Sequence, residues 1–359
     1  MRRSVTLIPG DGIGQSVTDA ACRVLDATGV DLEWDRHLVG APALERGAES
    51  PLPESVLASI REHGLALKGP VATPSGSGFR SVNVALRREL DLFAQVRPCR
   101  SRRSTPGLRT ADIDVVVVRE TTEDLYSGIE YASGEPATRE LIAWLTTHGA
   151  AVHPDAGISI KPISGSASRR MLDFAFSWAR DQGRRRVTIV HKATVMRATD
   201  GLFVTTAREV SREHPGIDVD ERQVDLTAAL LVARPEELDV LVMPNQYGDI
   251  LSDVAAAMIG GVGLAPGANY GDAVAMFEPA HGTAPRIADR GIANPVATIL
   301  SGALLLRHIG EADAADRVER AVDEVLADGE RVTYDLRPGR DLSGAATTSE
   351  MTDAIIERL

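Results

Sequence analysis

Short apolar runs rich in β-branched residues alternate with amphipathic helical patterns along this chain, and that alternation restricts the fold more than any other feature. Buried parallel strands read as continuous apolar runs, whereas helices repeat apolar residues three and four positions apart. Strand-like runs lie at 4–8, 65–67, 113–118, 187–190 and 240–243. Helical patterns lie at 16–28, 54–63, 138–148, 168–182, 200–213, 250–259, 294–308 and 313–327. The alternation predicts an α/β fold, and 359 residues favour about two domains.

Charge and composition exclude several classes of protein. The formal net charge of −12 argues against a general nucleic-acid binder. A short basic cluster, Arg100, Arg102 and Arg103, is interrupted by serine and is typical of a solvated loop. No uncharged apolar run approaches membrane-spanning length, and the two cysteines, Cys22 and Cys99, do not make a disulfide framework. Because the first residues also lack a signal-peptide pattern, we expect a cytoplasmic protein without membrane or nucleic-acid partners.

The glycine turn after the first strand invites a dinucleotide-binding interpretation that the sequence does not support. Gly10 and Gly12 follow the strand, but the third small residue of that fingerprint is replaced by Gln15. Glu33 lies at about the spacing of the ribose-binding acid, which alone is weak support. A tight turn that lets two backbones pack closely is the better interpretation.

Two carboxylates follow a predicted buried strand at 240–243. If a helix begins near Asp249, then Asp249 and Asp253 lie one turn apart on the same face. Carboxylate oxygens are the ligands that Mg²⁺ prefers, so the pair is a candidate metal site. A solvated helix N-terminus also favours aspartate and is the alternative.

Three arginines and two candidates for proton transfer precede these carboxylates in the sequence. Arg87, Arg97 and Arg119 carry planar donor forks suited to carboxylates, so together they imply a multiply charged anion if they converge. The alternative is three unrelated surface arginines. Tyr126 and Lys192 are candidate acid/base groups, because a lysine in a half-buried cationic pocket loses its proton near neutral pH. A core tyrosine and a strand-end lysine with its stem buried are the alternatives.

Two further segments leave their interpretation open. Asp225 precedes an apolar helical run, where a helix N-cap is the simpler role. The loop that runs from Glu278 through His281 to Asn294 contains glycine, histidine and asparagine. It is suited to wrapping an adenine and ribose, or it is a structural loop that ends at the proline before the next helix.

The complete set of motifs resembles the metal-dependent β-decarboxylating dehydrogenases, which include isocitrate, 3-isopropylmalate, homoisocitrate and tartrate dehydrogenases. The matching blocks are Leu7 to Gly14, Lys68-Gly-Pro70, Arg80 to Arg87, Val96-Arg-Pro98, Arg119-Glu120, Glu123 to Tyr126, His191-Lys192, Asn245 to Asp253 and His281 to Pro285. They extend over nearly the whole chain in the family order, and several are rare strings. The chain therefore resembles the isocitrate/isopropylmalate dehydrogenase family, and within it the bacterial isocitrate dehydrogenases most.

The resemblance implies a non-Rossmann α/β fold with two domains around a cleft. A large cofactor-binding domain is expected from 1–100 and 260–359, and a small domain from 101–259. The small domain is expected to carry a clasp segment at about 127–162 and the interface of a homodimer whose active sites are shared.

The resemblance also implies roles for single residues. Asp249 and Asp253 would bind Mg²⁺ or Mn²⁺ from one subunit and Asp225 from the other. Lys192, also from the partner, would assist removal of the hydroxyl proton, and Tyr126 would protonate the enolate left by decarboxylation. Substrate carboxylates would meet Ser81, Asn83, Arg87, Arg97 and Arg119. The cofactor would be bound by Lys68, Thr73, Glu278, His281, Gly282, Thr283, Ala284, Arg286, Asn294 and Tyr334.

Substrate and cofactor choice depend on few positions. Ser81 and Asn83 are the polar pair of isocitrate enzymes, whereas isopropylmalate enzymes have apolar residues there. Isocitrate is therefore expected, with another substituted malate, such as a phosphonomethylmalate, isopropylmalate, homoisocitrate or tartrate, as the alternative. Thr121 replaces the usual asparagine of the family, which is consistent with altered substrate tuning.

NADP is the expected cofactor, and NAD is the alternative. Arg286 stands where NAD-using relatives carry an aspartate, and an arginine pairs with a 2′-phosphate that an acid repels. Tyr334 matches a tyrosine of NADP-using enzymes, although Ile287 and Pro338 depart from their pattern. A non-catalytic regulatory subunit is a third hypothesis, but such subunits tend to lose the acid/base or metal residues that are complete here.

Overall fold

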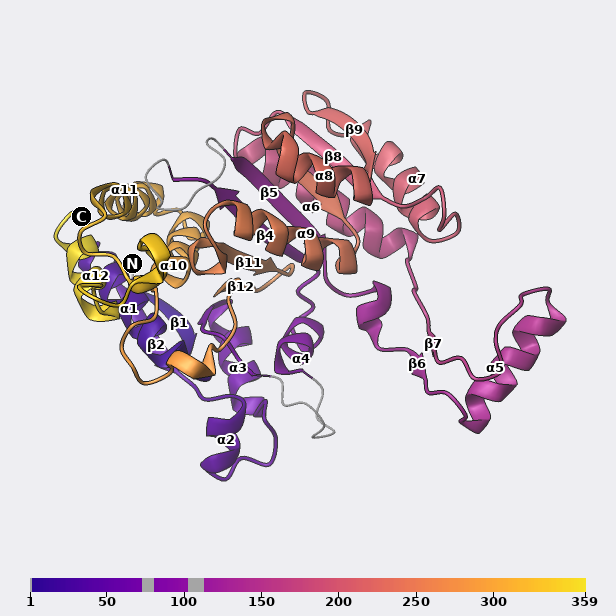
Figure 1. The fold of residues 1–359 in the computed structure, drawn as a ribbon, viewed down its shortest axis with the longest axis horizontal. Coiled ribbons are helices and arrows are strands. Elements are labelled where there is room, and N and C mark those ends of the chain that lie inside the picture. The colour runs from indigo at the N-terminus through magenta and orange to yellow at the C-terminus, as the bar shows by residue number, and fades with distance from the viewer. Residues whose placement is uncertain (1, 73–80, 103–112) are drawn as a thin grey trace.

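A ten-stranded sheet forms the centre of the molecule (Figure 1), which we describe from a computed structural model for residues 2–72, 81–102 and 113–359. Its strand order is β2-β1-β3-β12-β11-β4-β5-β10-β8-β9. The strands are β1 (Arg3–Ile8), β2 (Leu32–Arg36), β3 (Leu65–Lys68), β4 (Ala94–Arg100), β5 (Asp114–Glu120), β8 (Arg186–His191), β9 (Asp218–Gln223), β10 (Val240–Met243), β11 (Pro266–Tyr270) and β12 (Ala275–Pro279). Most neighbours are parallel, but β4 and β11 pair antiparallel with each other, and β4 also with β5 and β11 with β12.

Helices cover both faces of this sheet. They are α1 (Gly14–Ala27), α2 (Ala41–Glu45), α3 (Glu54–His63), α4 (Val82–Glu89), α5 (Pro136–Thr147), α6 (Gly165–Asp181), α7 (Asp200–Ser211), α8 (Val224–Ala233), α9 (Asn245–Met258), α10 (Val296–His308), α11 (Ala312–Asp328) and α12 (Thr348–Ile356). Six short 3₁₀ turns connect them within the described residues: η1 (Asp124–Ser127), η2 (Pro235–Glu237), η3 (Val262–Leu264), η4 (Pro285–Ile287), η5 (Tyr334–Leu336) and η6 (Pro338–Arg340). None of the helices in the described part is long and apolar enough to cross a membrane.

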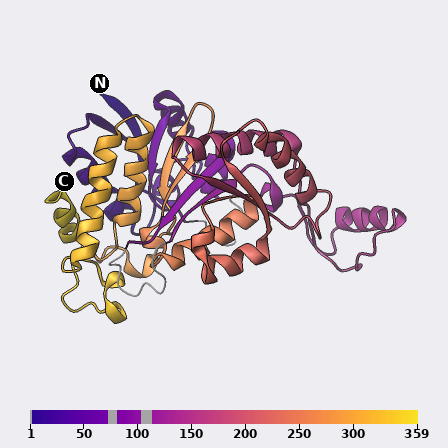
Figure 2. The same cartoon turned by 90° about the horizontal axis from the view of Figure 1, so that it is seen from above.

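Alternate residues of each strand face opposite helical layers, as strand geometry requires. In β5, Val116 and Val118 pack with α6 and α7, whereas Val117 and Arg119 face α9. By the same alternation one layer contains α3, α4, α8 and α9. The opposite layer contains α1, α6, α7 and α10, with α11 packed on α10 and α12 on α1 (Figures 1 and 2). The result is a three-layer α/β/α fold, and the two chain termini lie near each other at one end of it (Figure 1).

The glycine turn after β1 packs backbone against backbone. Gly10 has φ +80°, and a Cβ there would lie 2.0 Å from the carbonyl oxygen of Pro70. Gly12 has φ +58°, and its Cβ would lie 2.1 Å from the carbonyl oxygen of Thr283. Both positions therefore require glycine for conformation and for space. The close-packing interpretation of this turn is confirmed, and with it the rejection of a Rossmann fingerprint.

A long arm leaves the body after η1. It consists of β6 (Glu130–Tyr131), α5 and β7 (Ile158–Ser159), in which β6 and β7 pair antiparallel apart from the main sheet. Both views show α5 standing well away from the other helices (Figures 1 and 2). Trp144 of α5 is 57% exposed. The arm coincides with the predicted clasp segment at about 127–162, and a helix exposed on this scale suits a protein–protein contact.

Several expected elements differ from the structure. The helix expected at 250–259 begins five residues earlier, at Asn245, so Asp249 lies inside the helix rather than at its start. The chain after residue 250 was expected to be largely helical, but β11 and β12 lie there. Gly and Pro flank both short strands and mask their pattern. The domain boundaries at 100 and 260 stay a prediction, since the sheet continues across both.

Candidate active site

Helix α9 presents the two predicted metal ligands one turn apart. Asp249 accepts hydrogen bonds from Arg119 and from the hydroxyl of Tyr126. Asp253 pairs with Arg97 Nη1 at 3.1 Å and is otherwise well exposed. The helix begins directly after β10, so a strand end delivers both carboxylates to the gap beside α4. Their predicted shared face is confirmed.

The three predicted anion-binding arginines converge at this point. Arg97 and Arg119 are 9% and 2% exposed, which confirms the expectation that neither lies on the surface. Burial, helped by the charges of Arg87 and Arg97, lowers the pKa of Arg119 to about 10 against the opposite effect of Asp249. Gln95 contacts both Arg119 and Glu278, the partner of Arg87, which joins the arginines in one cluster. Burial alone would raise the pKa of the Asp249 carboxyl. The charge of Arg119 and the Tyr126 hydrogen bond, with Arg97 and Arg87, bring it below its usual value.

Tyr126 lies at the mouth of this cluster, in the 3₁₀ turn η1. Burial, the hydrogen bond to Asp249 and the charge of Asp249 raise its pKa to about 12, against a smaller opposite effect of Arg119. Arg119 lies over the ring at 5.0 Å from its centroid. Tyr126 is therefore a protonated phenol at neutral pH and can donate a proton, rather than accept one.

Lys192 and Asp225 form a separate pair at the ends of β8 and β9. Lys192 Nζ donates to Asp225 Oδ1 at 2.6 Å and to Gln223 Oε1 at 3.0 Å. Asp225 lies in the first turn of α8, where Gln223 occupies the N-cap position, so the N-cap interpretation is wrong. Within the part of the chain that the structure describes, no three His, Cys, Asp or Glu side chains gather to hold a metal ion. One chain therefore does not bring Asp225 together with Asp249 and Asp253.

A buried charge network lies on the other side of the arginines. Glu278 accepts from Lys68 Nζ at 2.8 Å and from Arg87 Nη2 at 3.0 Å. Burial would raise the Glu278 pKa, but the charges of Lys68 and Arg87 hold it well below its usual value. Gln95 and Asn269 complete the network, with Asn269 Nδ2 donating to Glu278 at 2.9 Å. The network fixes Arg87 between β12 and α4, which suits a positioning role for Glu278 and Lys68.

Ser81, one of the two residues predicted to select the substrate, borders a cavity between α4 and η1. This cavity, of about 750 Å³, is lined by α4 and η1, including Ser81, Thr121 and Tyr126. Asn83 lies one turn before Arg87 on α4, and its Oδ1 is buried without a hydrogen-bond partner among the described residues. A buried acceptor without a partner costs stability unless a bound molecule satisfies it. Asn83 is not among the residues that line this cavity, so its free acceptor lies on the face of α4 that Arg87 shares.

The predicted cofactor loop follows β12 and reaches back to the glycine turn. Ile13 N donates to Thr283 O at 3.0 Å, and Ala284 takes a left-handed conformation with φ +40°. His281 Nε2 is buried without a partner among the described residues, and burial lowers the pKa of this imidazole. Asn294 Nδ2 donates to Asp335 Oδ2 at 3.0 Å, next to Tyr334. Arg286, like Gly282, is exposed, and Thr73 lies outside the described residues.

A buried polar cluster was missed at the sequence level. Asp200, fully buried, accepts from Lys161 Nζ at 2.8 Å, from Tyr247 Oη at 3.0 Å and from the Lys192 backbone N–H at 2.7 Å. Lys161 comes from the base of the arm and Tyr247 from α9. Through Asp200, the cluster thus connects the backbone at Lys192 with helix α9. Lys161 after the apolar stretch Ile158 to Ile160 was the one available signal, because a lysine at a strand end next to proline needs a partner.

Comparisons with known proteins point to one family. The isocitrate/isopropylmalate dehydrogenase family model matches residues 4–355. A mitochondrial NAD isocitrate dehydrogenase catalytic subunit of Arabidopsis thaliana is 41% identical over 99% of this chain and 88% of its own length. An NADP isocitrate dehydrogenase of Archaeoglobus fulgidus is 38% identical over 98% and 91%. The crystal structure of isocitrate dehydrogenase from Methylococcus capsulatus superposes with a TM-score of 0.89 at 46% identity, covering 99% of both chains.

Proposed function

This chain belongs to the isocitrate/isopropylmalate dehydrogenase family, and we propose that it oxidises and decarboxylates isocitrate to 2-oxoglutarate with NADP as hydride acceptor. The observation that carries the proposal is the convergence of Arg87, Arg97 and Arg119 beside two aspartates of α9. Three cations in one buried cluster suit a substrate with several carboxylates. The polar residues Ser81 and Asn83 suit a charged distal group better than an alkyl one.

The residues fit a divalent cation by their donor chemistry. Asp249 and Asp253 offer only carboxylate oxygens, the ligands of Mg²⁺ and Mn²⁺, and no thiolate or imidazole stands with them among the described residues. When bound, the cation supplies Lewis-acid stabilisation of developing negative charge, and the nicotinamide accepts the hydride. Arg97 and Arg119 now pair with these carboxylates, and the same guanidinium groups are free to turn to substrate carboxylates once a cation takes the aspartates.

Two groups handle the protons. Lys192, directly after β8, would take the proton of the substrate hydroxyl in its neutral amine form, with Gln223 and Asp225 holding Nζ in place. Tyr126 would give a proton to the carbon that loses carbon dioxide, because its raised pKa keeps it protonated. Separate acid and base allow both proton transfers in one cycle.

A homodimer with shared sites completes the proposal. Asp225 and Lys192 stand apart from Asp249 and Asp253 in one chain, so a second copy would supply them. Helix α8 is apolar from Ala228 to Ala233, and its Leu226 and Val232 are 50% and 56% exposed. Ile250 on neighbouring α9 is 56% exposed. An apolar face of this kind, continuous with the candidate site, suits a partner copy.

NADP is preferred over NAD for electrostatic reasons. Arg286 is exposed in the loop that follows β12, where its guanidinium would pair with the 2′-phosphate of NADP. Asp335 accepts from Asn294 and Thr333, which holds the turn that carries Tyr334 next to the cofactor loop. The Arabidopsis relative carries NAD in its name and the Archaeoglobus relative NADP, so the names support both cofactors.

The deciding experiment measures NADPH and NADH formation by the purified protein with isocitrate and Mg²⁺. Isopropylmalate, tartrate and a phosphonomethylmalate serve as parallel substrates. Rapid reduction of NADP with isocitrate alone supports the proposal. Strong turnover of another malate with slow isocitrate turnover contradicts the substrate and keeps the chemistry. If none of these substrates is turned over in the presence of metal, the result contradicts catalysis by this chain and favours the regulatory-subunit hypothesis.

A further inference from the structure

A second cavity lies behind the active-site arginines, on the opposite face of the sheet. Arg97 of β4 points towards α9, so Pro98 and Arg100 point the other way. They line a cavity of about 190 Å³ together with side chains of α6 and α10. The two faces of β4 and β11 thus carry two different openings: the candidate active site between α4 and α9, and this rear cavity between α6 and α10.

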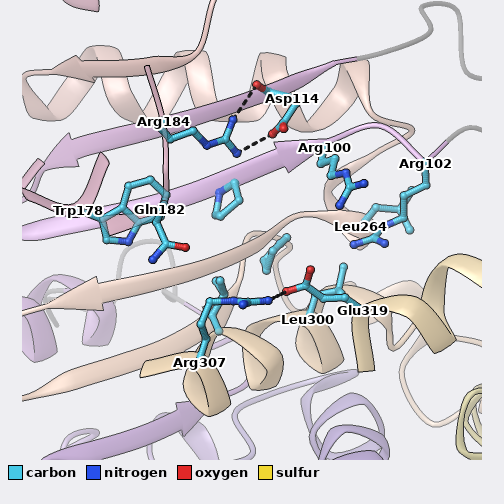
Figure 3. A pocket seen from close by; sticks show the side chains of 13 residues that line it. Arg100, Arg102, Asp114, Trp178, Gln182, Arg184, Leu264, Leu300, Arg307 and Glu319 are labelled. Atoms are coloured by element: carbon cyan, nitrogen blue, oxygen red, sulfur yellow. Dashed lines mark hydrogen bonds and ion pairs between the residues drawn. The ribbon is translucent and has the colours of Figure 1, made fainter. Parts of the chain in front are cut away.

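The lining of the rear cavity is rich in guanidinium groups (Figure 3). Arg184 and Arg307 stand on opposite sides, with Arg100 and Arg102 at one end and Trp178 with Gln182 at the other. Two carboxylates, Asp114 and Glu319, share this lining against the four arginines. Asp239, Asp316 and Asp323 pair with three of these arginines from outside the lining, so Arg100 is the one guanidinium of the lining without a carboxylate partner among the described residues.

Most of the arginines are held in place by carboxylates at the rim. Arg184 pairs with Asp114 at 2.7 Å and Asp239 at 3.1 Å, and Arg307 with Asp316 at 2.7 Å and Glu319 at 2.9 Å. Arg102 pairs with Asp323. These contacts orient the donor forks, and each guanidinium keeps N–H groups free for a further acceptor.

Arg100 differs from the other three. Its side chain forms no ion pair or hydrogen bond with any residue that the structure describes. Its charge repels that of Arg102, whose pKa is lowered to about 10, mainly by burial. The side chain of Arg102 is only 10% exposed, so the prediction of a solvated basic loop is wrong for this residue. Arg103 lies outside the described residues. An unpaired cation beside a buried one favours an anion between them.

We propose that the rear cavity binds a small organic or inorganic polyanion, with carboxylate or phosphate groups held by Arg100, Arg184 and Arg307, and that binding there inhibits turnover. The volume lies below the roughly 300–1,000 Å³ of drug-sized sites, so the ligand is small. The indole of Trp178 and the leucines of α10 supply an apolar wall, which suits a short carbon skeleton.

Inhibition follows from the position of the cavity. A polyanion that bridges Arg184 near α6 and Arg307 on α10 draws these two helices together behind the sheet. Strands β4, β5 and β11 form the common floor of both openings, so approach at the rear widens the gap between α4 and α9 at the front. A ligand that binds the front-open state better shifts the population away from the closed one. Only this inhibitory part rests on the proposed function; binding itself does not.

Calorimetric titration of the purified full-length protein tests the binding. The probes are tricarballylate and pyrophosphate, each added alone in metal-free buffer of low ionic strength, so that the carboxylate and phosphate arms are separate. Arg100→Ala should weaken binding of at least one probe by about tenfold or more, since a charge-assisted contact is lost. Arg180→Ala is the matched control. It removes an exposed arginine of α6 that does not line the cavity, and it should bind the probes as wild type does. Arg97→Gln, which changes the front site alone, should also bind normally.

Three results overturn the site. These are no binding of either probe, equal affinity in wild type and Arg100→Ala, or a loss confined to Arg97→Gln, which would put the probe in the front opening. The inhibitory role is measured separately, as the probe's effect on isocitrate turnover. Inhibition is expected in wild type and Arg180→Ala and much less in Arg100→Ala; unchanged wild-type turnover at saturating probe would contradict it. If isocitrate is not turned over at all, the titration still decides on the site.

Discussion

Lys192 Nζ lies 2.6 Å from Asp225 Oδ1, so a predicted proton acceptor and a predicted cation ligand are paired within one chain. The hydrogen bond from Lys192 is the main cause that lowers the pKa of Asp225. Neither side chain joins Asp249 and Asp253 of the same chain. One chain therefore contains two halves of different sites, and their separation makes the roles of single residues testable.

Lys192→Met should abolish turnover without unfolding the protein. Lys192 is partly exposed and contributes two hydrogen bonds at the surface of the site, so the core is unaffected. Loss of a general base typically lowers kcat about 10²–10⁴-fold. Steady-state kinetics with circular dichroism measures both effects. Lys192→Arg is the matched control, because it keeps the charge near Asp225 but cannot lose its proton at neutral pH. Activity of either variant near that of wild type would contradict the role.

Two inactive variants should restore activity when they share a dimer. If Lys192 and Asp253 act in the same site from different subunits, a mixed dimer of Lys192→Met and Asp253→Asn has one intact site and one doubly altered site. Random exchange makes about half of the dimers mixed, so about a quarter of wild-type turnover should return. The measurement is activity after the two proteins are refolded together. No recovery, with mixed dimers present by mass, would mean that each chain builds its own site.

Tyr126→Phe should lower kcat about 10²-fold or more and change KM little. The hydroxyl is the only part removed, and the ring keeps its contact with Arg119. Because the pKa of Tyr126 is raised to about 12, the phenol stays protonated through neutral pH and acts as an acid there. The wild-type profile should thus show no loss of this proton below about pH 10 in the unliganded protein. A variant with unchanged kcat would assign the proton donation to another group.

The elements of this fold that were predictable are those with a continuous pattern. The buried run Val115 to Val118 was predicted as a strand and the glycines at 10 and 12 as a close-packed turn, and the structure has both. Strands β11 (Pro266–Tyr270) and β12 (Ala275–Pro279) were missed because both are short, β11 begins with Pro-Gly and β12 ends with proline. Their places in the sheet depend on long-range pairing with β4 and β3, which local pattern does not reveal.

The residues of the candidate site could be predicted from the sequence, but their hydrogen-bond and ion-pair partners could not. Arg119 and Asp249 were both singled out, yet their direct pairing depends on the start of α9 at Asn245. Asp200 was not found, since an aspartate near a helix start is ordinarily a solvated residue. Only tertiary packing brings it three donors: Lys161 at the base of the arm, Tyr247 of α9 and the backbone N–H of Lys192. Sequence carries the chemistry of a residue, and tertiary packing selects what it touches.

Glu278→Gln should destabilise the protein by about 3–5 kcal/mol, because Lys68 and Arg87 would remain buried without their shared carboxylate. Urea unfolding measures the free energy, and Glu236→Gln on the surface is the control. The Glu278 pKa is depressed in the folded state. Its contribution is therefore complete above the unfolded value of about 4.3 and declines as pH falls through the folded value. The gap between wild type and Glu278→Gln should narrow below about pH 4. Equal stability at neutral pH would contradict the network's importance.

Arg286→Asp should reverse the cofactor preference. The guanidinium is exposed and has no ion pair among the described residues, so its replacement leaves the fold unchanged. Loss of a charge-assisted pair with the 2′-phosphate, and gain of a repelling carboxylate, should shift the NADP-to-NAD ratio of kcat/KM about 100-fold or more towards NAD. Initial rates with each cofactor at saturating isocitrate give the ratio, and Arg185→Asp controls for the change in net charge. A ratio that stays constant would mean that the 2′-phosphate is recognised elsewhere. A wild-type protein that already prefers NAD would refute the NADP proposal and leave the family chemistry intact.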